Sequence, residues 1–248
     1  MFTSFNARAL GLTLPAAATI DLAASAGFEG VDLLVRDLMD AGLDPRALRN
    51  RMDALGLRGG AWPLPVDWRG GDKRFVDDLH RLPALARAAS LLGLNRTATW
   101  LMPETPELPP TEATREAHRC RVRDLHAQRL GAIARILADH GTRLGLEVIG
   151  VASSRTGRGL PLYVRLGDPD LAQLLETLRA DTPGVGLLVD AFHLYAAAEP
   201  MEVAWSRGVN SVIGVHVADL PASAMADRAL LRDGERGLPG ENGAIDVQ

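Results

Sequence analysis

The stretch Gly186-Leu187-Leu188-Val189-Asp190-Ala191-Phe192-His193-Leu194-Tyr195 decides the fold. Its first four residues are apolar and follow the turn pair Pro183-Gly184, which is typical of a strand buried on both faces. Asp190 stands where this strand ends, and His193 comes three residues later. In a parallel barrel, functional residues gather at this edge because loops can vary there without disturbing the core. The structural alternative is that Asp190 caps a helix whose first turn contains His193.

Two further apolar runs bear on this choice, one because it carries a glutamate and the other because it carries a histidine. Glu147 lies in the run 143–150. His216 lies in the run 211–219. A carboxylate is rarely buried without a partner, so a glutamate inside a strand requires a compensating charge. We therefore expect Glu147, Asp190 and His216 to meet at three strand ends, where they would bind Mn²⁺ or Mg²⁺, with Co²⁺ or Zn²⁺ as the other possibilities.

Length and charge narrow the class of protein. A chain of 248 residues fits one α/β barrel or two small domains. The net charge of −4 offers no basic footprint for a nucleic acid. No apolar run approaches the roughly 20 residues of a membrane span, and the N-terminus lacks the pattern of a signal peptide. We predict a cytoplasmic protein with neither a nucleic-acid nor a membrane partner.

Strands alternate with helices along the whole chain. The expected strands lie at 2–6, 28–34, 57–61, 97–101, 144–149, 186–190 and 211–217. Helices are expected at 14–27, 44–55, 72–92 and 112–140, and from 168 onward. This alternation predicts a parallel sheet with right-handed crossovers. The sequence contains no glycine-rich dinucleotide turn after the first strand, no P-loop, no GxSxG and no HExxH, which argues against the common nucleotide-binding, hydrolase and zincin classes.

Four segments in the second half of the chain also carry a family resemblance. In chain order they are GLEVIG, LLVDAFHLY, VIGVHVADLP and RGLPGENGAID. They resemble the xylose-isomerase-like TIM-barrel superfamily of sugar isomerases and epimerases. The resemblance implies a metal-dependent isomerase or epimerase that acts on a keto sugar or a related hydroxy-carbonyl compound. Members of that family continue into a further helix and strand that supplies another glutamate, and this sequence ends at Gln248.

The resemblance also implies roles for individual residues. Glu147 would be both a metal ligand and the catalytic group that moves a proton through an enediolate. His193 and Arg236 would bind the substrate, although Arg236 also reads as an ordinary solvated charge. Trp62 and Trp100 end the third and fourth expected strands, so their rings would wall the pocket or belong to the core. Two turn residues near the end, Glu241 and Asp246, are candidates for the missing ligand.

These observations lead to one overall prediction. We expect residues 1–248 to form a single xylose-isomerase-like TIM (β/α) barrel domain that lacks its eighth βα unit. A gap should then separate the first and last strands, with 221–248 as an irregular tail, low activity and possible homo-oligomers. A polyol dehydratase and a non-catalytic metal- or sugar-binding protein are the alternatives. An endonuclease IV-like nuclease fits poorly, because the chain has only 6 histidines for a metal cluster.

Overall fold

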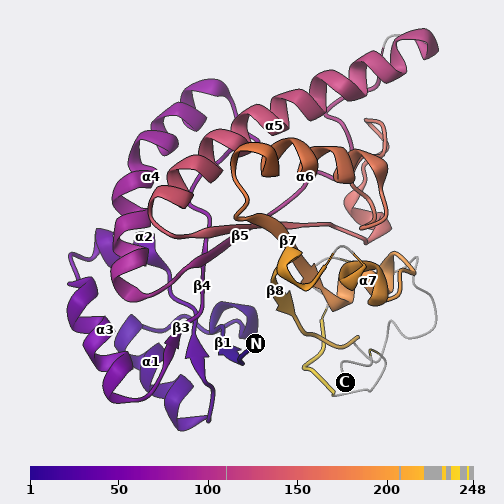
Figure 1. The fold of residues 1–248 in the computed structure, drawn as a ribbon. Coiled ribbons are helices and arrows are strands. Elements are labelled where there is room, and N and C mark those ends of the chain that lie inside the picture. Colours follow the sequence, from indigo (N-terminus) through magenta and orange to yellow (C-terminus); the bar gives the residue numbers. More distant parts are fainter. Residues whose placement is uncertain (110, 207, 221–230, 233–235, 241–244, 246–248) are drawn as a thin grey trace. The chain divides into compact units, whose positions relative to one another are not determined.

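In the computed structural model, the described residues are 1–109, 111–206, 208–220, 231–232, 236–240 and 245 (Figure 1). They form two compact units, one of residues 1–98 with 132–144 and one of residues 99–131 with 145–248. The single domain expected from the sequence stays a prediction. No helix among the described residues has the length and apolar character needed to cross a membrane.

The described strands form an α/β fold of parallel type, as the alternation predicts. Their order is β1-β2-β3 in one sheet and β4-β5-β6-β7-β8 in the other. The bounds are β1 Ser4–Phe5, β2 Gly30–Val31, β3 Arg58–Gly59, β4 Ala61–Pro63, β5 Arg96–Trp100, β6 Arg143–Glu147, β7 Val185–Asp190 and β8 Val212–His216. The pairs β1–β2, β2–β3, β4–β5 and β7–β8 are parallel. The strand expected at 57–61 is divided at Gly60, where a side chain would meet Asp32 Oδ1 at 2.1 Å.

The helices alternate with these strands. They are α1 Ala16–Ser25, α2 Val35–Asp40, α3 Pro45–Ala54, α4 Asp72–Leu92, α5 Arg115–Asp139, α6 Pro169–Asp181, α7 Ala191–Ala196 and α8 Glu202–Trp205. The Asp-Pro pairs at 44–45 and 168–169 begin α3 and α6, with each aspartate side chain accepting a backbone N–H at the helix start. The short helices α2 and α8 are not among the expected helices, because segments of four to six residues give little periodic signal. Helix α7 is the helix that the capping alternative places after Asp190.

Strand β7 is the centre of the second unit. All six of its residues are buried, as the apolar run predicts. It lies beside β8 (Figure 1). The register of this pair sets Asp190 opposite His216. The end of β7 is therefore held both by its own buried side chains and by its neighbour.

The middle of the loop of residues 150–167 is bound by a buried carboxylate of the same unit. Glu104 is buried and accepts hydrogen bonds from Thr156 N at 2.9 Å, Thr156 Oγ1 at 2.5 Å and Gly157 N at 3.0 Å. Gly159 lies so close to Thr105 that an added Cβ would stand 1.7 Å from its carbonyl oxygen. The loop therefore has a fixed backbone at this point.

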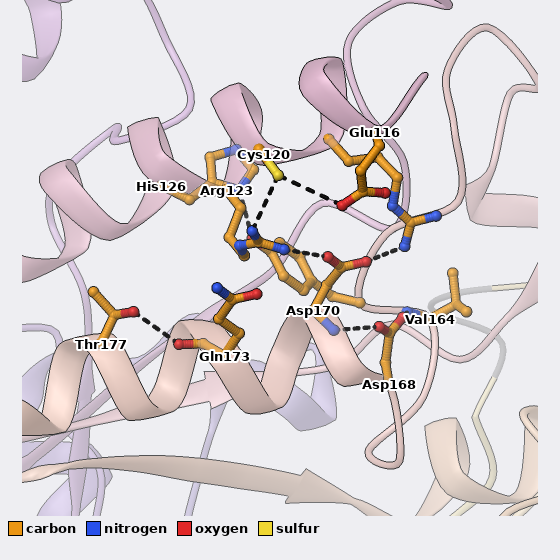
Figure 2. A network of polar contacts seen from close by, with 11 residues as sticks. Glu116, Cys120, Arg123, His126, Val164, Asp168, Asp170, Gln173 and Thr177 are labelled. Atoms are coloured by element: carbon orange, nitrogen blue, oxygen red, sulfur yellow. Dashed lines mark hydrogen bonds and ion pairs between the residues drawn. The ribbon is translucent and has the colours of Figure 1, made fainter. Parts of the chain in front are cut away.

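Helices α5 and α6 are joined by a buried ion-pair network (Figure 2). Asp170, which is 5% exposed, bonds Arg123 Nη1 at 2.7 Å and also pairs with Arg119. Arg123 in turn donates to Cys120 Sγ at 3.3 Å. Burial alone would lower the pKa of the Arg123 guanidinium, but the hydrogen bond to Asp170, together with the charge of Asp170 and the interactions with Cys120, raises it. The network satisfies two charges that would be costly if buried alone.

Two predictions about the end of the chain are not tested: the gap between the first and last strands, and the irregular tail. Within the described residues, β1 has a hydrogen-bonded neighbour in β2 and β8 has one in β7. The expected gap between the first and last strands depends on how the two units are arranged, and it stays a prediction. Most of the predicted irregular tail at 221–248 lies outside the described residues.

Replacing Asp170 by Ala should lower the free energy of unfolding by about 3–5 kcal/mol, because it strands the buried Arg123 without its partner. Urea denaturation followed by circular dichroism measures this difference. Glu176→Ala, at an exposed position of the same helix, is the matched control and should change stability little. A loss for Asp170→Ala no larger than that of the control would contradict the structural role of the network.

Candidate functional site

Asp190 is both a helix cap and the most buried acid of the site. It ends β7 and precedes α7, and its Oδ1 accepts hydrogen bonds from Phe192 N at 2.9 Å and His193 N at 3.3 Å. Its side chain is fully buried. The capping interpretation is therefore confirmed, and it does not exclude a second role. With Oδ1 committed to α7, Oδ2 is the oxygen that faces the rest of the site.

The structure brings Glu147 and His216 to this carboxylate. Glu147 is the last residue of β6, and His216 is the last residue of β8. His216 Nδ1 lies 3.6 Å from Glu147 Oε1 and 3.6 Å from Asp190 Oδ2. The three residues that the sequence places at separate strand ends thus lie together. Their role as metal ligands stays a prediction.

His193 belongs to the same cluster. Glu147, Asp190 and His193 each offer one ligand atom, and these atoms lie within 4.8 Å of one another. Metal–ligand bonds of about 2.0–2.6 Å place two ligand atoms up to roughly 4–5 Å apart. The donor set of two carboxylates and imidazole nitrogen therefore fits a divalent cation in both chemistry and spacing. Sequence reasoning placed His193 near these residues and assigned it to the substrate; the spacing of its ring nitrogen also fits a ligand.

Arg236 closes the cluster from the C-terminal part of the chain. Its Nη1 contacts Asp190 Oδ2, its Nη2 lies 3.1 Å from His193 Nε2, and its guanidinium lies 5.0 Å from the centre of the Phe192 ring. It is therefore no ordinary solvated charge, although its role in binding a substrate stays a prediction.

Asp219 fixes the segment that carries Arg236, and sequence reasoning did not assign it a role. The backbones of Asp219 and Gly237 form an antiparallel bridge, with hydrogen bonds of 3.1 and 2.9 Å. The buried Asp219 side chain accepts from Leu220 N at 2.8 Å and Ile245 N at 3.3 Å. The aspartate in the VIGVHVADLP segment was the signal available in the sequence.

The charges of the cluster stabilise one another. Burial alone would raise the pKa of Asp190, but the neighbouring His216 and the charge of Arg236 hold that pKa well below its usual range. Burial would likewise lower the pKa of His216, yet the adjacent carboxylates of Asp190 and Glu147 raise it to about 10. The cluster is thus built to hold anionic oxygens next to cations.

The remaining predicted site residues differ in exposure. Trp62 is buried, with 2% of its surface exposed, and its carbonyl accepts Thr97 Oγ1 at 2.7 Å. Trp100, at the end of β5, is 40% exposed. Their contact with a substrate stays a prediction. Glu241 and Asp246 lie outside the described residues.

A small molecule can approach the cluster from one side. The cavity that Asp190 and His193 line with Leu188 measures about 10 Å³, which is room for little more than one water molecule. By contrast, 46% of the His216 side chain and 28% of the Arg236 side chain are exposed. His216 and Arg236 are therefore the more exposed described members of the cluster.

Replacing Gly150 by Ala should disturb the cluster through the backbone. An added Cβ would stand 2.0 Å from the His193 carbonyl oxygen, so α7 must shift. We expect a loss of about 1–3 kcal/mol in unfolding free energy, measured by urea denaturation. Gly71→Ala is the control, because a Cβ there meets nothing within 4 Å. Equal stability of the two variants would show that α7 does not pack as described.

Comparisons with known proteins bear on the family and the fold. The family model described as xylose isomerase-like TIM barrel matches residues 20–248. A search of the curated proteins found no match. A xylose isomerase domain protein from Alicyclobacillus acidocaldarius has a TM-score of 0.75 at 27% identity, over 91% of this chain and 75% of its own.

Two further solved structures share the fold at lower identity. The IOLI protein, crystallised with a zinc atom, has a TM-score of 0.75 at 16% identity over 100% of this chain and 82% of its own. The 3-keto-D-glucoside 4-epimerase YcjR from E. coli has a TM-score of 0.64 at 16% identity, over 88% and 78%. The parallel α/β fold and the match over 20–248 together show that this chain belongs to the xylose isomerase-like TIM-barrel family.

Proposed function

We propose that this chain is a divalent-metal-dependent isomerase or epimerase that acts on a keto sugar or a related hydroxy-carbonyl compound. The observation that carries the proposal is the cluster of Glu147, Asp190 and His193, with ligand atoms within 4.8 Å of one another at the ends of β6 and β7. Family membership and the sugar epimerase among the structures of similar fold support the reaction class.

The donor atoms favour a hard or borderline cation. Carboxylate oxygens with imidazole nitrogens suit Mn²⁺, Mg²⁺, Co²⁺ or Zn²⁺, and the zinc atom in the IOLI protein supports a divalent ion in this family. When bound, such an ion polarises the carbonyl group of the substrate and orients its neighbouring hydroxyl oxygen.

Glu147 is the group best placed to move the proton. Asp190 uses Oδ1 to cap α7 and Oδ2 to pair with Arg236, so neither of its oxygens is available as a base. The carboxylate of Glu147 caps no helix and keeps 14% of its side chain exposed. In this proposal it takes the proton from the carbon next to the carbonyl, as a general base must lie within reach of that carbon.

The exposed side chains of the cluster provide substrate contacts. Arg236 offers several N–H donors, which suit the hydroxyl and carbonyl oxygens of a sugar. His193 lies 3.1 Å from Arg236 and can share the same oxygen. The substrate class therefore follows from the chemistry of the site: a small, oxygen-rich molecule with a carbonyl group.

A first test follows proton exchange at the substrate carbon. Metal-stripped protein reloaded with Mn²⁺, Mg²⁺, Co²⁺ or Zn²⁺ is incubated in D₂O with a panel of ketoses and aldoses. Reisolated sugars, freed of metal, are analysed by NMR for deuterium next to the carbonyl carbon. We expect exchange with at least one ketose, and a loss of about 10²–10⁴-fold in Glu147→Gln because the base is gone. Glu176→Gln, an exposed glutamate of α6, is the matched control.

The outcome also separates the alternatives. Metal binding without deuterium exchange for any sugar would contradict the proposal and favour a non-catalytic binding protein. Loss of water from the substrate would favour a dehydratase of the same family.

A second test compares variants of the two histidines, to separate effects on metal binding from effects on substrate binding. His216 Nδ1 lies near both carboxylates, whereas His193 Nε2 is engaged with Arg236. We therefore expect His216→Ala to weaken metal binding by about 10-fold or more, and His193→Ala to weaken sugar binding more than metal binding. Calorimetry with Mn²⁺ alone, and then with the sugar, measures each affinity. Equal loss of metal binding in both variants would make His193 a metal ligand together with His216.

A further inference from the structure

Arg236 contacts two of the atoms that a metal ion would use. Asp190 Oδ1 is occupied by the backbone N–H groups of α7, which leaves Oδ2 as the oxygen open to a cation. Arg236 Nη1 pairs with that oxygen, and Arg236 Nη2 lies 3.1 Å from His193 Nε2. The guanidinium is thus bound at the atoms through which Asp190 and His193 could ligate an ion.

The position of Arg236 is fixed by the chain around it. The residue next to it, Gly237, is paired with the buried Asp219 in an antiparallel bridge. The guanidinium also lies 5.0 Å from the centre of the Phe192 ring, in the first turn of α7. A backbone bridge on one side and an aromatic face on the other hold the charge beside the buried Asp190. Held in this way, the guanidinium balances the negative charge of the buried Asp190 carboxylate in the metal-free protein.

We infer that Arg236 is a built-in counter-cation that competes with the divalent ion for Asp190 Oδ2. A guanidinium and a divalent ion on the same oxygen repel each other, so Arg236 has to leave Oδ2 as the ion binds. The inference rests on the proposed metal site and deepens it. Once released from Asp190, the guanidinium can turn toward a substrate oxygen, so that loading of the ion and readiness to bind the substrate are coupled.

Removing Arg236 should change the metal affinity in the direction opposite to removing a ligand. A residue that helps to build a metal site loses affinity when it is removed, whereas a competitor gains it. Removing the Arg236 charge should therefore tighten metal binding. It should also destabilise the metal-stripped protein, because Asp190 would then be buried with less compensation. By linkage, saturation with the ion should reduce the stability difference from wild type.

The test is calorimetric titration of chelator-stripped protein with Zn²⁺ alone. We expect Arg236→Met to bind Zn²⁺ at least about 5-fold more tightly than wild type, and Arg236→Lys to stay close to wild type. Arg165→Met, at an exposed arginine of the same unit, controls for the loss of a positive charge elsewhere. Circular dichroism establishes that each variant is folded. Unchanged or weaker binding by a folded Arg236→Met would overturn the inference.

A measurement on the wild-type chain covers the case in which Arg236→Met does not fold. In protein labelled with ¹⁵N-arginine, Zn²⁺ should shift one arginine side-chain resonance that Arg236→Lys lacks. No shift of that resonance at saturation would also overturn the inference. If the wild-type chain binds no Zn²⁺, Mn²⁺, Mg²⁺ or Co²⁺ at all, the proposed metal site itself fails. If it binds one and Arg236 has no influence, only the counter-cation role fails.

Discussion

The site depends on the solvation of one buried carboxylate. Asp190 has no exposed side-chain surface, and an isolated charge in that position would be far too costly to keep. The protein replaces the lost water with directed partners. Two backbone N–H groups of α7 bind one oxygen, while Arg236 and His216 approach the other. Each partner comes from a different part of the chain, so satisfying this charge also fixes where α7, the end of β8 and the segment around Gly237 must lie. The contacts that make the buried Asp190 carboxylate tolerable in the fold are therefore also the contacts that arrange the candidate cation site.

Much of this arrangement could be predicted from local sequence. The apolar runs around Glu147, Asp190 and His216 give the buried strands, and the rule that functional residues collect at the carboxyl ends of parallel strands brings the three together. The Asp-Pro pairs likewise locate the starts of α3 and α6. At Asp190 the sequence offered a choice between helix cap and site residue, and the structure shows both the cap and the proximity to Glu147 and His216. The two interpretations use different oxygens of one carboxylate, which a residue pattern cannot distinguish.

Other features depend on tertiary contacts that leave no mark in a sequence pattern. The contact between Arg236 and Asp190 joins residues 46 positions apart, and a basic residue near a turn looks the same whether it is solvated or paired. His193 was assigned to the substrate by resemblance, but the spacing of its ring nitrogen from the two carboxylates, within 4.8 Å, is a tertiary fact that only the structure gives. Trp62 shows the reverse case: its position at a strand end fits a pocket wall, yet its burial is that of a core residue. The aspartate at position 219 is visible in the sequence, but its backbone bridge to Gly237 is a tertiary pairing that a residue pattern does not give.

The hydrogen bonds to the Glu104 carboxylate lower the entropy cost for a ligand that binds at the segment after β6. Three hydrogen-bond donors from Thr156 and Gly157 converge on it, so the long segment after β6 is already ordered at its tip. Each residue held in one backbone conformation has given up about 1–2 kcal/mol of conformational entropy during folding. A molecule that contacts this segment does not bear that cost when it binds, and more of its contact energy remains as affinity. Because the segment needs no reordering, such an encounter should also be fast and similar in rate for different ligands.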